Sequence, residues 1–164
     1  MADSPPTVRW WQRPAIPLAA TRLGGWFFVR VAPAIDRLLV RITRGRLSTA
    51  VGFPTLILTT IGAKTGQVRT TPLIYLPIGD QIVLVASNGG GPRHPGWYHN
   101  LRARPDVSAL VRGVAASYTA REATGDERAA LWAQAAALYP GYITYQQRTA
   151  GRSIPIVVLT RRPG

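Results

Sequence analysis

Between residues 54 and 160, apolar positions come in short runs that turn residues separate, and this pattern predicts β-strands. The expected strands are 54–61, 68–77, 81–86, 107–112, 114–121 and 154–160. Gly113 separates the fourth strand from the fifth, which predicts a hairpin. Six strands with few helices are typical of a small antiparallel barrel.

Helical patterns predict the elements between these strands. Residues 97–103 form one short expected helix. Thr124 as N-cap and Glu127 three positions later fit a capping box, so we expect an alanine-rich helix that runs to about Leu138. Pro140–Gly141 breaks this helix, and a second short helical piece follows it. The expected fold is therefore α+β and mainly β, with a helix inserted before the last strand.

The first 45 residues differ in pattern from the rest of the chain. Residues 1–17 carry four prolines, which predicts an extended arm. Residues 33–44 place apolar side chains at i, i+3, i+4 and i+7, with three arginines on the opposite side. The apolar positions are Ile35, Leu38, Leu39 and Ile42, and the basic positions are Arg37, Arg41 and Arg44. We therefore divide the chain into an N-terminal arm with an amphipathic helical segment (1–45) and a barrel domain (46–164).

The charge of the chain indicates an anionic partner. Its 164 residues include 20 Lys and Arg against 7 Asp and Glu, which gives a formal net charge of +13. Because 46% of the residues are hydrophobic, the chain is expected to fold rather than to remain a disordered polybasic segment. Nucleic acid, an anionic membrane surface and a phosphorylated cofactor would each suit this charge.

Side chains for acid–base, nucleophilic or metal chemistry are scarce. The chain has no cysteine, and its two histidines, His94 and His99, do not have the spacing of metal ligands on one helix face. Residues 62–65 lack the glycine that precedes lysine in a Walker A loop, and residues 89–91 do not open the helix of a βαβ unit. We therefore expect no metal and no catalytic side chain. This scarcity suits a reaction carried by an organic cofactor, and it also suits a binding protein.

Three segments carry residues that suit ligand binding. The loop 62–69 has two glycines, whose N–H groups can approach an anion closely, together with Lys64 and Arg69. Residues 86–100 are rich in glycine and proline, and irregular loops of this kind often carry functional sites. Residues 139–145 hold three tyrosines spaced by three, which would cluster on one side of a helical turn. Each segment also has a purely structural interpretation. These are, in the same order, a solvated hairpin loop, an ordinary loop and aromatic packing at a barrel mouth.

These segments resemble a known family, the deazaflavin-dependent nitroreductases, which bind coenzyme F420 on a split β-barrel. The similar stretches read LILTTIGAKTGQVRTTPL, then VASNGG and HPGWYHNL, then YPGY and RSIPIVVL. They follow one another in the expected order over residues 54–160. The resemblance implies that reduced coenzyme F420, an 8-hydroxy-5-deazaflavin, passes a hydride to a quinone or a nitroaromatic acceptor.

The resemblance also implies roles for individual residues. Lys64, Thr65, Gly66 and Arg69 would hold the phosphate and acidic tail of the cofactor. The residues expected to line the deazaflavin are Pro72, Leu73, Ala86, Ser87, Asn88, Gly96, Trp97 and Asn100. The residues expected to face the acceptor are Ser87, Tyr139, Tyr142 and Tyr145. The chain departs from the family at Ala63, where arginine is common, and at Asn88, where a basic residue sometimes stands.

Two other functions remain open at this point, a small basic nucleic-acid-binding module and a non-catalytic cofactor-binding protein at a membrane surface. No helix-turn-helix, zinc-finger or RNP motif is recognisable, so no nucleic-acid partner is expected. Residues 1–12 lack the basic start and apolar run of a signal peptide, which indicates a cytoplasmic protein. The segment 33–44 either binds the anionic inner face of the cell membrane or packs on the barrel.

Overall fold

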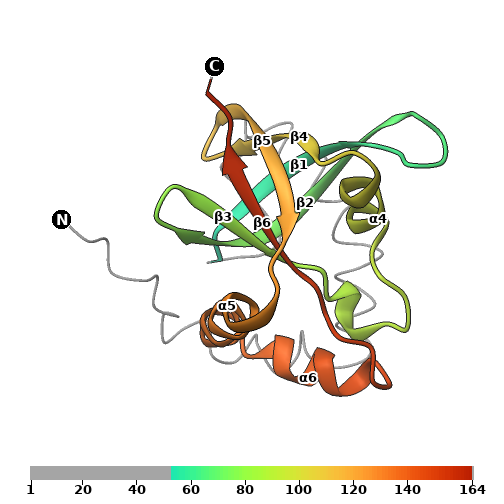
Figure 1. The fold of residues 1–164 in the computed structure, drawn as a ribbon, viewed down its shortest axis with the longest axis vertical. Helices are drawn as coiled ribbons and strands as arrows, with labels where there is room; N and C mark the ends of the chain where they lie inside the picture. Colours follow the sequence, from blue (N-terminus) through green and yellow to red (C-terminus); the bar gives the residue numbers. More distant parts are fainter. Residues whose placement is uncertain (1–52, 164) are drawn as a thin grey trace.

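The six expected strands are all present in the computed structural model, which describes residues 53–163 (Figure 1). They are β1 (Thr55–Ile61), β2 (Val68–Ile78), β3 (Gln81–Val85), β4 (Asp106–Val111), β5 (Val114–Glu122) and β6 (Ile156–Arg161). The helices in this range are α4 (Gly96–Ala103), α5 (Gly125–Leu138) and α6 (Gly141–Arg148), and η2 (Asn88–Gly90) is a short 3-10 turn. None of these helices is long and apolar enough to cross a membrane. The arm and helix expected at 1–45 lie outside the described residues.

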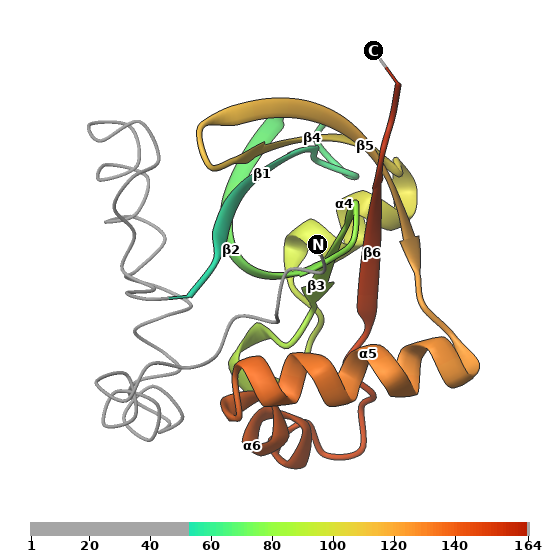
Figure 2. The ribbon, with the colours of Figure 1, turned by 90° about the vertical axis from the view of Figure 1, so that its left-hand side faces the viewer.

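The strands close into an antiparallel barrel in the order β1-β2-β3-β6-β5-β4. β1 pairs with β2 on one side and with β4 on the other, so that Ile57 lies opposite both Pro72 and Leu110. β6 comes last in the chain and is inserted between β3 and β5. Figure 2 shows the strands as a ring with α5 and α6 below it. The antiparallel barrel predicted from the strand pattern is confirmed.

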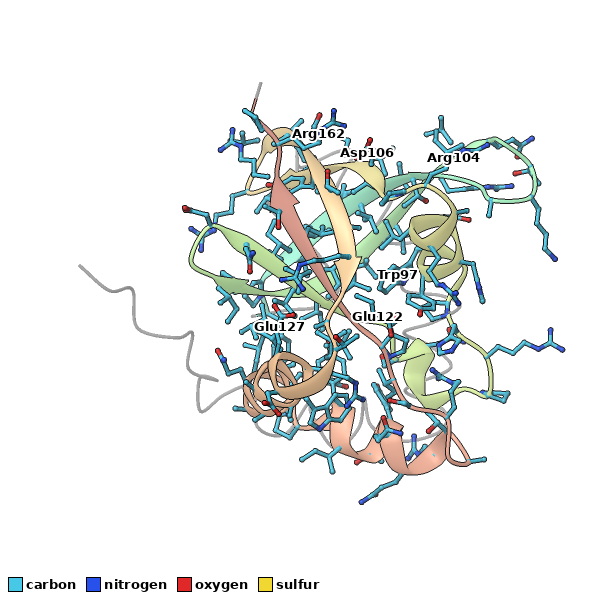
Figure 3. All side chains as sticks on the ribbon, in the orientation of Figure 1. Trp97, Arg104, Asp106, Glu122, Glu127 and Arg162 are labelled. Atoms are coloured by element: carbon cyan, nitrogen blue, oxygen red, sulfur yellow. The ribbon has the colours of Figure 1, made fainter. Side chains whose placement is uncertain are left out.

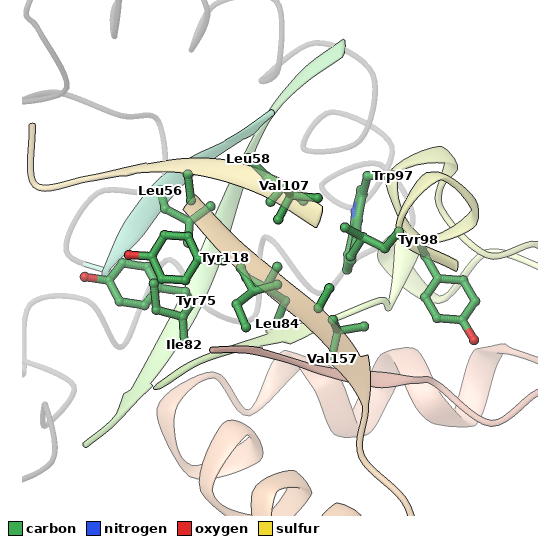
Figure 4. Close-up of a cluster of buried hydrophobic side chains, with 14 of the residues drawn as sticks. Leu56, Leu58, Tyr75, Ile82, Leu84, Trp97, Tyr98, Val107, Tyr118 and Val157 are labelled. Carbon is green, nitrogen blue, oxygen red and sulfur yellow. The ribbon is translucent and has the colours of Figure 1, made fainter. Parts of the chain in front are cut away.

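The interior of the barrel is filled by inward side chains of all six strands and by one face of α4. Leu58, Leu84 and Leu159 are fully buried there, and Trp97 and Leu101 of α4 belong to the same cluster. Figure 4 shows Trp97 beside Val107, on the side from which α4 reaches the cluster. Because a small barrel must be filled by side chains, α4 serves as its plug.

A second apolar cluster lies on the outer face of the barrel, under α5 and α6. Val83 of β3 and Val158 of β6 pack there against Leu131 and Leu138 of α5. These two strands are therefore buried on both faces. This burial explains why their sequences are continuous apolar runs rather than alternating patterns.

The capping box predicted for α5 is wrong in its contacts. Thr124 does occupy the N-cap position, but its side chain makes no capping hydrogen bond. Glu127 pairs instead with Arg121 of β5, through contacts of 2.6 Å and 2.7 Å. Both carboxylate oxygens of Glu127 are therefore bonded to Arg121, in an exposed ion pair at the end of β5.

The segment before the last strand also differs from the prediction. The two helical pieces predicted here are present as α5 and α6, and only the start of the last strand differs. The last strand begins at Ile156 rather than at Ile154, because the Ile154 N–H donates to Gln146 Oε1 at 2.9 Å. This bond ties the chain to α6 before it enters the barrel.

Candidate functional site

The loop between β1 and β2 is a tight turn that presents Lys64 to solvent. The Gly66 N–H donates to the Gly62 carbonyl, and the Gly62 N–H donates to the Gln67 carbonyl, both at 2.8 Å. Gly66 has a φ of 68°, which glycine adopts without strain. Arg69 is exposed and donates to Gln67 Oε1 at 2.8 Å. The loop therefore has the compact shape and the charge that suit an anion.

Asn100 of α4 fastens this loop to the helix. Its Oδ1 accepts the Ala63 N–H at 2.9 Å, and its Nδ2 donates to Thr60 Oγ1 at 3.0 Å. Thr60 is buried, with 2% of its surface exposed, so its bond to Asn100 lies at the barrel core, whereas the bond to the Ala63 N–H is exposed. The family resemblance implies that Asn100 lines the cofactor ring. In the structure, its side chain also positions the loop.

Arg104 adds a cation that the sequence analysis missed. It follows directly after α4, and its Nη1 donates to the Gly62 carbonyl at 3.4 Å. Figure 3 shows its exposed side chain next to the β1–β2 loop. Arg104 stands 42 positions from Gly62, so no local pattern could have placed it there. It brings positive charge to a loop in which Ala63 supplies none.

Residues 87–91, here called the Ser87 turn, follow β3. The Gly90 N–H donates to the Ser87 carbonyl at 3.1 Å, and the Gly91 N–H donates to the Asn88 carbonyl at 3.0 Å. The Asn88 side chain donates to the Arg93 carbonyl at 3.0 Å. Asn88 therefore shapes the turn with its amide, at a backbone φ of 52°. Ala86, directly before the turn, is fully buried in the barrel cluster, so its side chain is a core group.

Gly90 allows the Ser87 turn to pack directly on α6. Its φ is 77°, and a Cβ atom at this position would lie 2.9 Å from the Tyr145 carbonyl oxygen and 3.0 Å from the Tyr145 Cα. Both atoms belong to the helix backbone and cannot move aside easily. A glycine is therefore required for this contact, which joins two of the three segments that the sequence singled out.

Arg152 ties the Ser87 turn to the chain that leads into β6. Its Nη2 donates to the Ser87 carbonyl at 3.2 Å and to the Gly91 carbonyl at 2.8 Å, and its Nη1 lies 2.9 Å from His94 Nδ1. The sequence analysis assigned Arg152 no role. The available signal was its place at the start of the stretch RSIPIVVL, where it is the charged residue in an otherwise mostly apolar run.

The three tyrosines do cluster, as their spacing predicts. The ring centroids are 5.0 Å apart for Tyr139 and Tyr142, and 6.4 Å apart for Tyr142 and Tyr145. The hydroxyls of Tyr139 and Tyr145 are 3.0 Å apart. The expected single helical turn is wrong, because Tyr139 ends α5 and the other two lie on α6. Burial raises the pKa of all three, so they remain protonated and act as hydrogen-bonding groups rather than as bases.

The remaining predicted residues divide between the core and the surface. Trp97 is buried in the barrel cluster, whereas Gly96, at the start of α4, is exposed. Pro72 and Leu73 are half-buried on β2, and Leu73 packs against the barrel cluster. α4 thus carries Gly96, Trp97 and Asn100, and of these Asn100 contacts the β1–β2 loop. The tyrosine-bearing α6 lies at the bottom of Figure 1, well away from that loop at the upper right.

The closed barrel of six antiparallel strands, with α4 packed against its interior, has the split-barrel fold of the F420-dependent reductases. A profile of the F420H(2)-dependent quinone reductase family matches residues 35–161, and the chain belongs to that family. In a match over 129 residues, it is 45% identical to the F420H(2)-dependent quinone reductase Rv1261c of Mycobacterium tuberculosis. That match covers 76% of this chain and 86% of the relative.

Solved structures agree with this assignment. A structure of the F420-H2 dependent reductase FDR-A is 40% identical and superposes with a TM-score of 0.60, over 65% of this chain and 93% of that one. A second structure, described as a domain-swapped dimer, is 37% identical with a TM-score of 0.62, over 77% of this chain and 93% of that one. The split barrel and the cofactor implied by the sequence resemblance are confirmed. The protein is an oxidoreductase that uses coenzyme F420 to reduce a quinone.

Asn100→Ala should loosen the β1–β2 loop, because it removes both bonds between this loop region and α4. We expect faster hydrogen exchange at the Ala63 amide and weaker binding of coenzyme F420, by about 1–3 kcal/mol, the cost of leaving such groups unpaired. Amide exchange and a fluorescence titration measure the two effects. His99→Gln, an exposed neighbour on the same helix, is the control. Unchanged Ala63 exchange in Asn100→Ala would show that the loop holds its shape without α4.

Proposed function

We propose that the β1–β2 loop holds the anionic end of coenzyme F420. The donor set fits a phosphate and an acidic tail: the exposed Lys64 and Arg69, the Thr65 hydroxyl and, in addition, Arg104. Gly66, whose own N–H donates to the Gly62 carbonyl, would shape the loop around the anion. The observation that carries this proposal is the bond from Ala63 to Asn100. It builds the cationic loop and α4 into one unit, so the two ends of a bound cofactor would be held at a constant separation.

We propose that the deazaflavin ring lies beside the first turn of α4 and the Ser87 turn. A Cβ atom at Gly96 would meet no other atom within 4 Å, so the backbone of α4 is open to a flat group there. The other residues proposed to line the ring are Pro72, Leu73, Ala86, Ser87, Asn88, Trp97 and Asn100. The core positions among them, Ala86 and Trp97, would act by shaping the wall rather than by direct polar contact.

The chain itself supplies binding and orientation to this reaction. When bound, the reduced deazaflavin supplies the hydride that converts a quinone, with one proton, to a hydroquinone. The protein holds the two rings in reacting geometry, and the buried apolar side of α4 keeps water from one side of the site. Nitroaromatic compounds are also planar and electron-poor, and we propose them as second acceptors. Family membership favours this enzyme over a nucleic-acid-binding module and over a non-catalytic carrier.

Lys64→Ala tests the proposed anion site. We expect binding of coenzyme F420 to weaken by about 1.5–3 kcal/mol, as for the loss of a hydrogen bond to a charged group. The remaining affinity should depend less on salt than that of the wild type, because one charged contact is gone. A cofactor fragment without phosphate and acidic tail should bind both proteins alike. Titrations at several salt concentrations measure these effects.

The control for Lys64→Ala is Arg112→Ala, which removes an exposed cation from the β4–β5 turn. It should leave binding unchanged, since the turn lies away from the loop. If Lys64→Ala weakens binding of the intact cofactor and of the fragment equally, then Lys64 stabilises the protein rather than the anionic end of the cofactor.

We propose that Tyr139, Tyr142 and Tyr145, together with Ser87, shape the acceptor side of the site. The support is the contact of Gly90 with Tyr145, which places the tyrosine cluster directly behind the Ser87 turn. Tyr139→Phe removes the Tyr139 hydroxyl, which lies 3.0 Å from the Tyr145 hydroxyl, and keeps the aromatic ring. We expect a several-fold change in KM and in the preference between menadione and a nitroaromatic, with Kd for the cofactor unchanged. A collapse of cofactor binding would assign the cluster to the cofactor site or the core.

We further propose that the segment 1–45 acts apart from the barrel domain 46–164 and attaches the protein to the cytoplasmic face of the cell membrane. The support for this proposal is the amphipathic sequence pattern of residues 33–44. These residues lie outside the described structure. Arginines near an anionic leaflet contribute about 1 kcal/mol each. Quinones dissolved in lipid would then meet the enzyme at that surface.

Replacing Arg37, Arg41 and Arg44 together by glutamate should abolish sedimentation of the full-length protein with anionic liposomes at low salt. Turnover of menadione in solution should persist, because the barrel keeps its cofactor site. A matched triple replacement of the exposed Arg93, Arg112 and Arg161 by glutamate, outside the segment 1–45, should leave sedimentation intact. If the wild-type protein does not sediment with the liposomes, the membrane proposal is wrong.

A further inference from the structure

The chain between α6 and β6 is built to hold Arg152 in one place. The Arg152 carbonyl accepts from Gln146 Nε2 at 2.8 Å and lies 2.6 Å from the Thr149 hydroxyl, which is itself buried. Gln146 also accepts the Ile154 N–H at 2.9 Å. The Arg152 N–H donates to the Thr149 carbonyl at 3.2 Å, so the backbone on both sides of Arg152 is anchored to the end of α6. An arginine at the surface of a loop would not need such support.

The guanidinium of Arg152 uses this anchorage to join parts of the chain that are far apart in sequence. It donates to two carbonyls of the Ser87 turn, 61 and 65 positions away, and it contacts His94, 58 positions away. The Ser87 carbonyl also accepts the Gly90 N–H, so the same oxygen closes the turn and receives Arg152. The planar guanidinium can reach several acceptors at once, which the single ammonium group of a lysine cannot do in this geometry.

The contact between Arg152 and His94 requires a neutral imidazole. Arginine can only donate, so His94 Nδ1 must accept and its proton must be on Nε2. Around this ring lie Arg152 from the chain before β6, Tyr98, His99 and Arg102 from α4, and Glu122 from β5. Among these groups, Arg152, His99 and Arg102 oppose protonation of His94, and Glu122 favours it. Tyr98 donates to Glu122 at 2.6 Å, which draws that carboxylate toward α4.

Burial, and then the charge of Arg152, lower the pKa of His94 below its ordinary value of 6.5. A group whose pKa is lowered by folding binds fewer protons in the folded state than in the unfolded state. Its contribution to stability is therefore complete above about pH 6.5 and is lost as the pH falls through the lowered value. At that point the acceptor for Arg152 is gone and two cations face each other.

We propose that Arg152 is a positioning residue for the reaction and keeps the Ser87 turn in the shape that binds cofactor and acceptor. Protonation of His94 weakens the contacts of Arg152 and lets the turn move. The inference rests on the proposed function of the Ser87 turn. Ser87 is proposed to meet both reactants, and its carbonyl is one of the atoms that Arg152 holds. A turn that can shift would still admit the reactants but would orient them less well, which lowers kcat more than it raises KM.

The first test needs no cofactor. In the full-length protein, Arg152→Met removes the three contacts and keeps an apolar stem of similar length. We expect hydrogen exchange at the Gly90 and Gly91 amides to become at least tenfold faster, because these amides close the turn. Arg161→Met, which removes an exposed cation from β6, is the matched control and should leave this exchange unchanged. Unchanged exchange at Gly90 and Gly91 in Arg152→Met would overturn the proposal.

The second test follows His94 by NMR titration in the same cofactor-free proteins. In Arg152→Met the His94 pKa should rise toward 6.5, since a positive charge has left its side. Arg152→Lys keeps the charge, so its His94 pKa should stay below that of Arg152→Met, while exchange of the turn remains fast because the ammonium cannot bridge the same acceptors. Full restoration of slow exchange by lysine would show that charge alone is sufficient, and the role assigned to the guanidinium would be wrong.

The third test connects the turn to turnover with menadione. Arg152→Met should lower kcat at least tenfold with a smaller change in KM. In the wild type, kcat should fall as His94 becomes protonated, and His94→Phe should remove that part of the pH profile. If Arg152→Met does not fold, His94→Phe takes its place, because it removes one contact of Arg152 and leaves the two bonds to carbonyls. His94→Phe should accelerate hydrogen exchange at the Gly90 amide. Unchanged exchange at Gly90 in this variant would also overturn the proposal. If exchange accelerates in Arg152→Met but kcat is unchanged, Arg152 holds the turn while the proposed function of the turn is wrong.

Discussion

The interior of a closed six-stranded barrel must be filled, and α4 fills the part next to the β1–β2 loop with Trp97, Tyr98 and Leu101. The rest of the site depends on this packing. With its apolar face in the barrel, α4 turns Asn100 toward Thr60 and Ala63 and thereby holds the cationic loop. The same packing determines where the chain from the Ser87 turn must arrive. The need to fill the barrel interior therefore places both proposed parts of the cofactor site, the β1–β2 loop and the Ser87 turn.

Several arginines donate hydrogen bonds to backbone carbonyls rather than to carboxylates. The chain has 20 cationic and 7 acidic side chains, so most arginines have no carboxylate to pair with. Arg104 donates to the Gly62 carbonyl, Arg128 to that of Ile154, and Arg152 to those of Ser87 and Gly91. Among residues 53–163, none of these three arginines forms an ion pair with a carboxylate. Such charges fit an enzyme whose cofactor carries its own phosphate and acidic tail.

Local patterns predicted the elements well where the partner of each residue is near in the chain. The strands follow from alternation and short apolar runs, and the two-glycine turn at 62–66 follows from its composition. The prediction failed where a residue has a partner outside the motif that its sequence pattern suggests. Glu127 leaves Thr124 for Arg121 of β5, and Ile154 leaves the last strand for the Gln146 side chain. Tyr139 and Tyr145 meet across the junction of two helices rather than within one helical turn.

The sequence by itself determined the barrel, the cationic loop and, by resemblance, the cofactor, because strand alternation, turn glycines and ordered family segments are all properties of contiguous residues. Only the tertiary structure decided how the site is held together. Asn100 and Ala63 are 37 positions apart, and Arg152 and Ser87 are 65 positions apart. A hydrogen bond between such residues leaves no periodicity in the chain, since its geometry depends on how β1, α4 and the segment before β6 pack around one core.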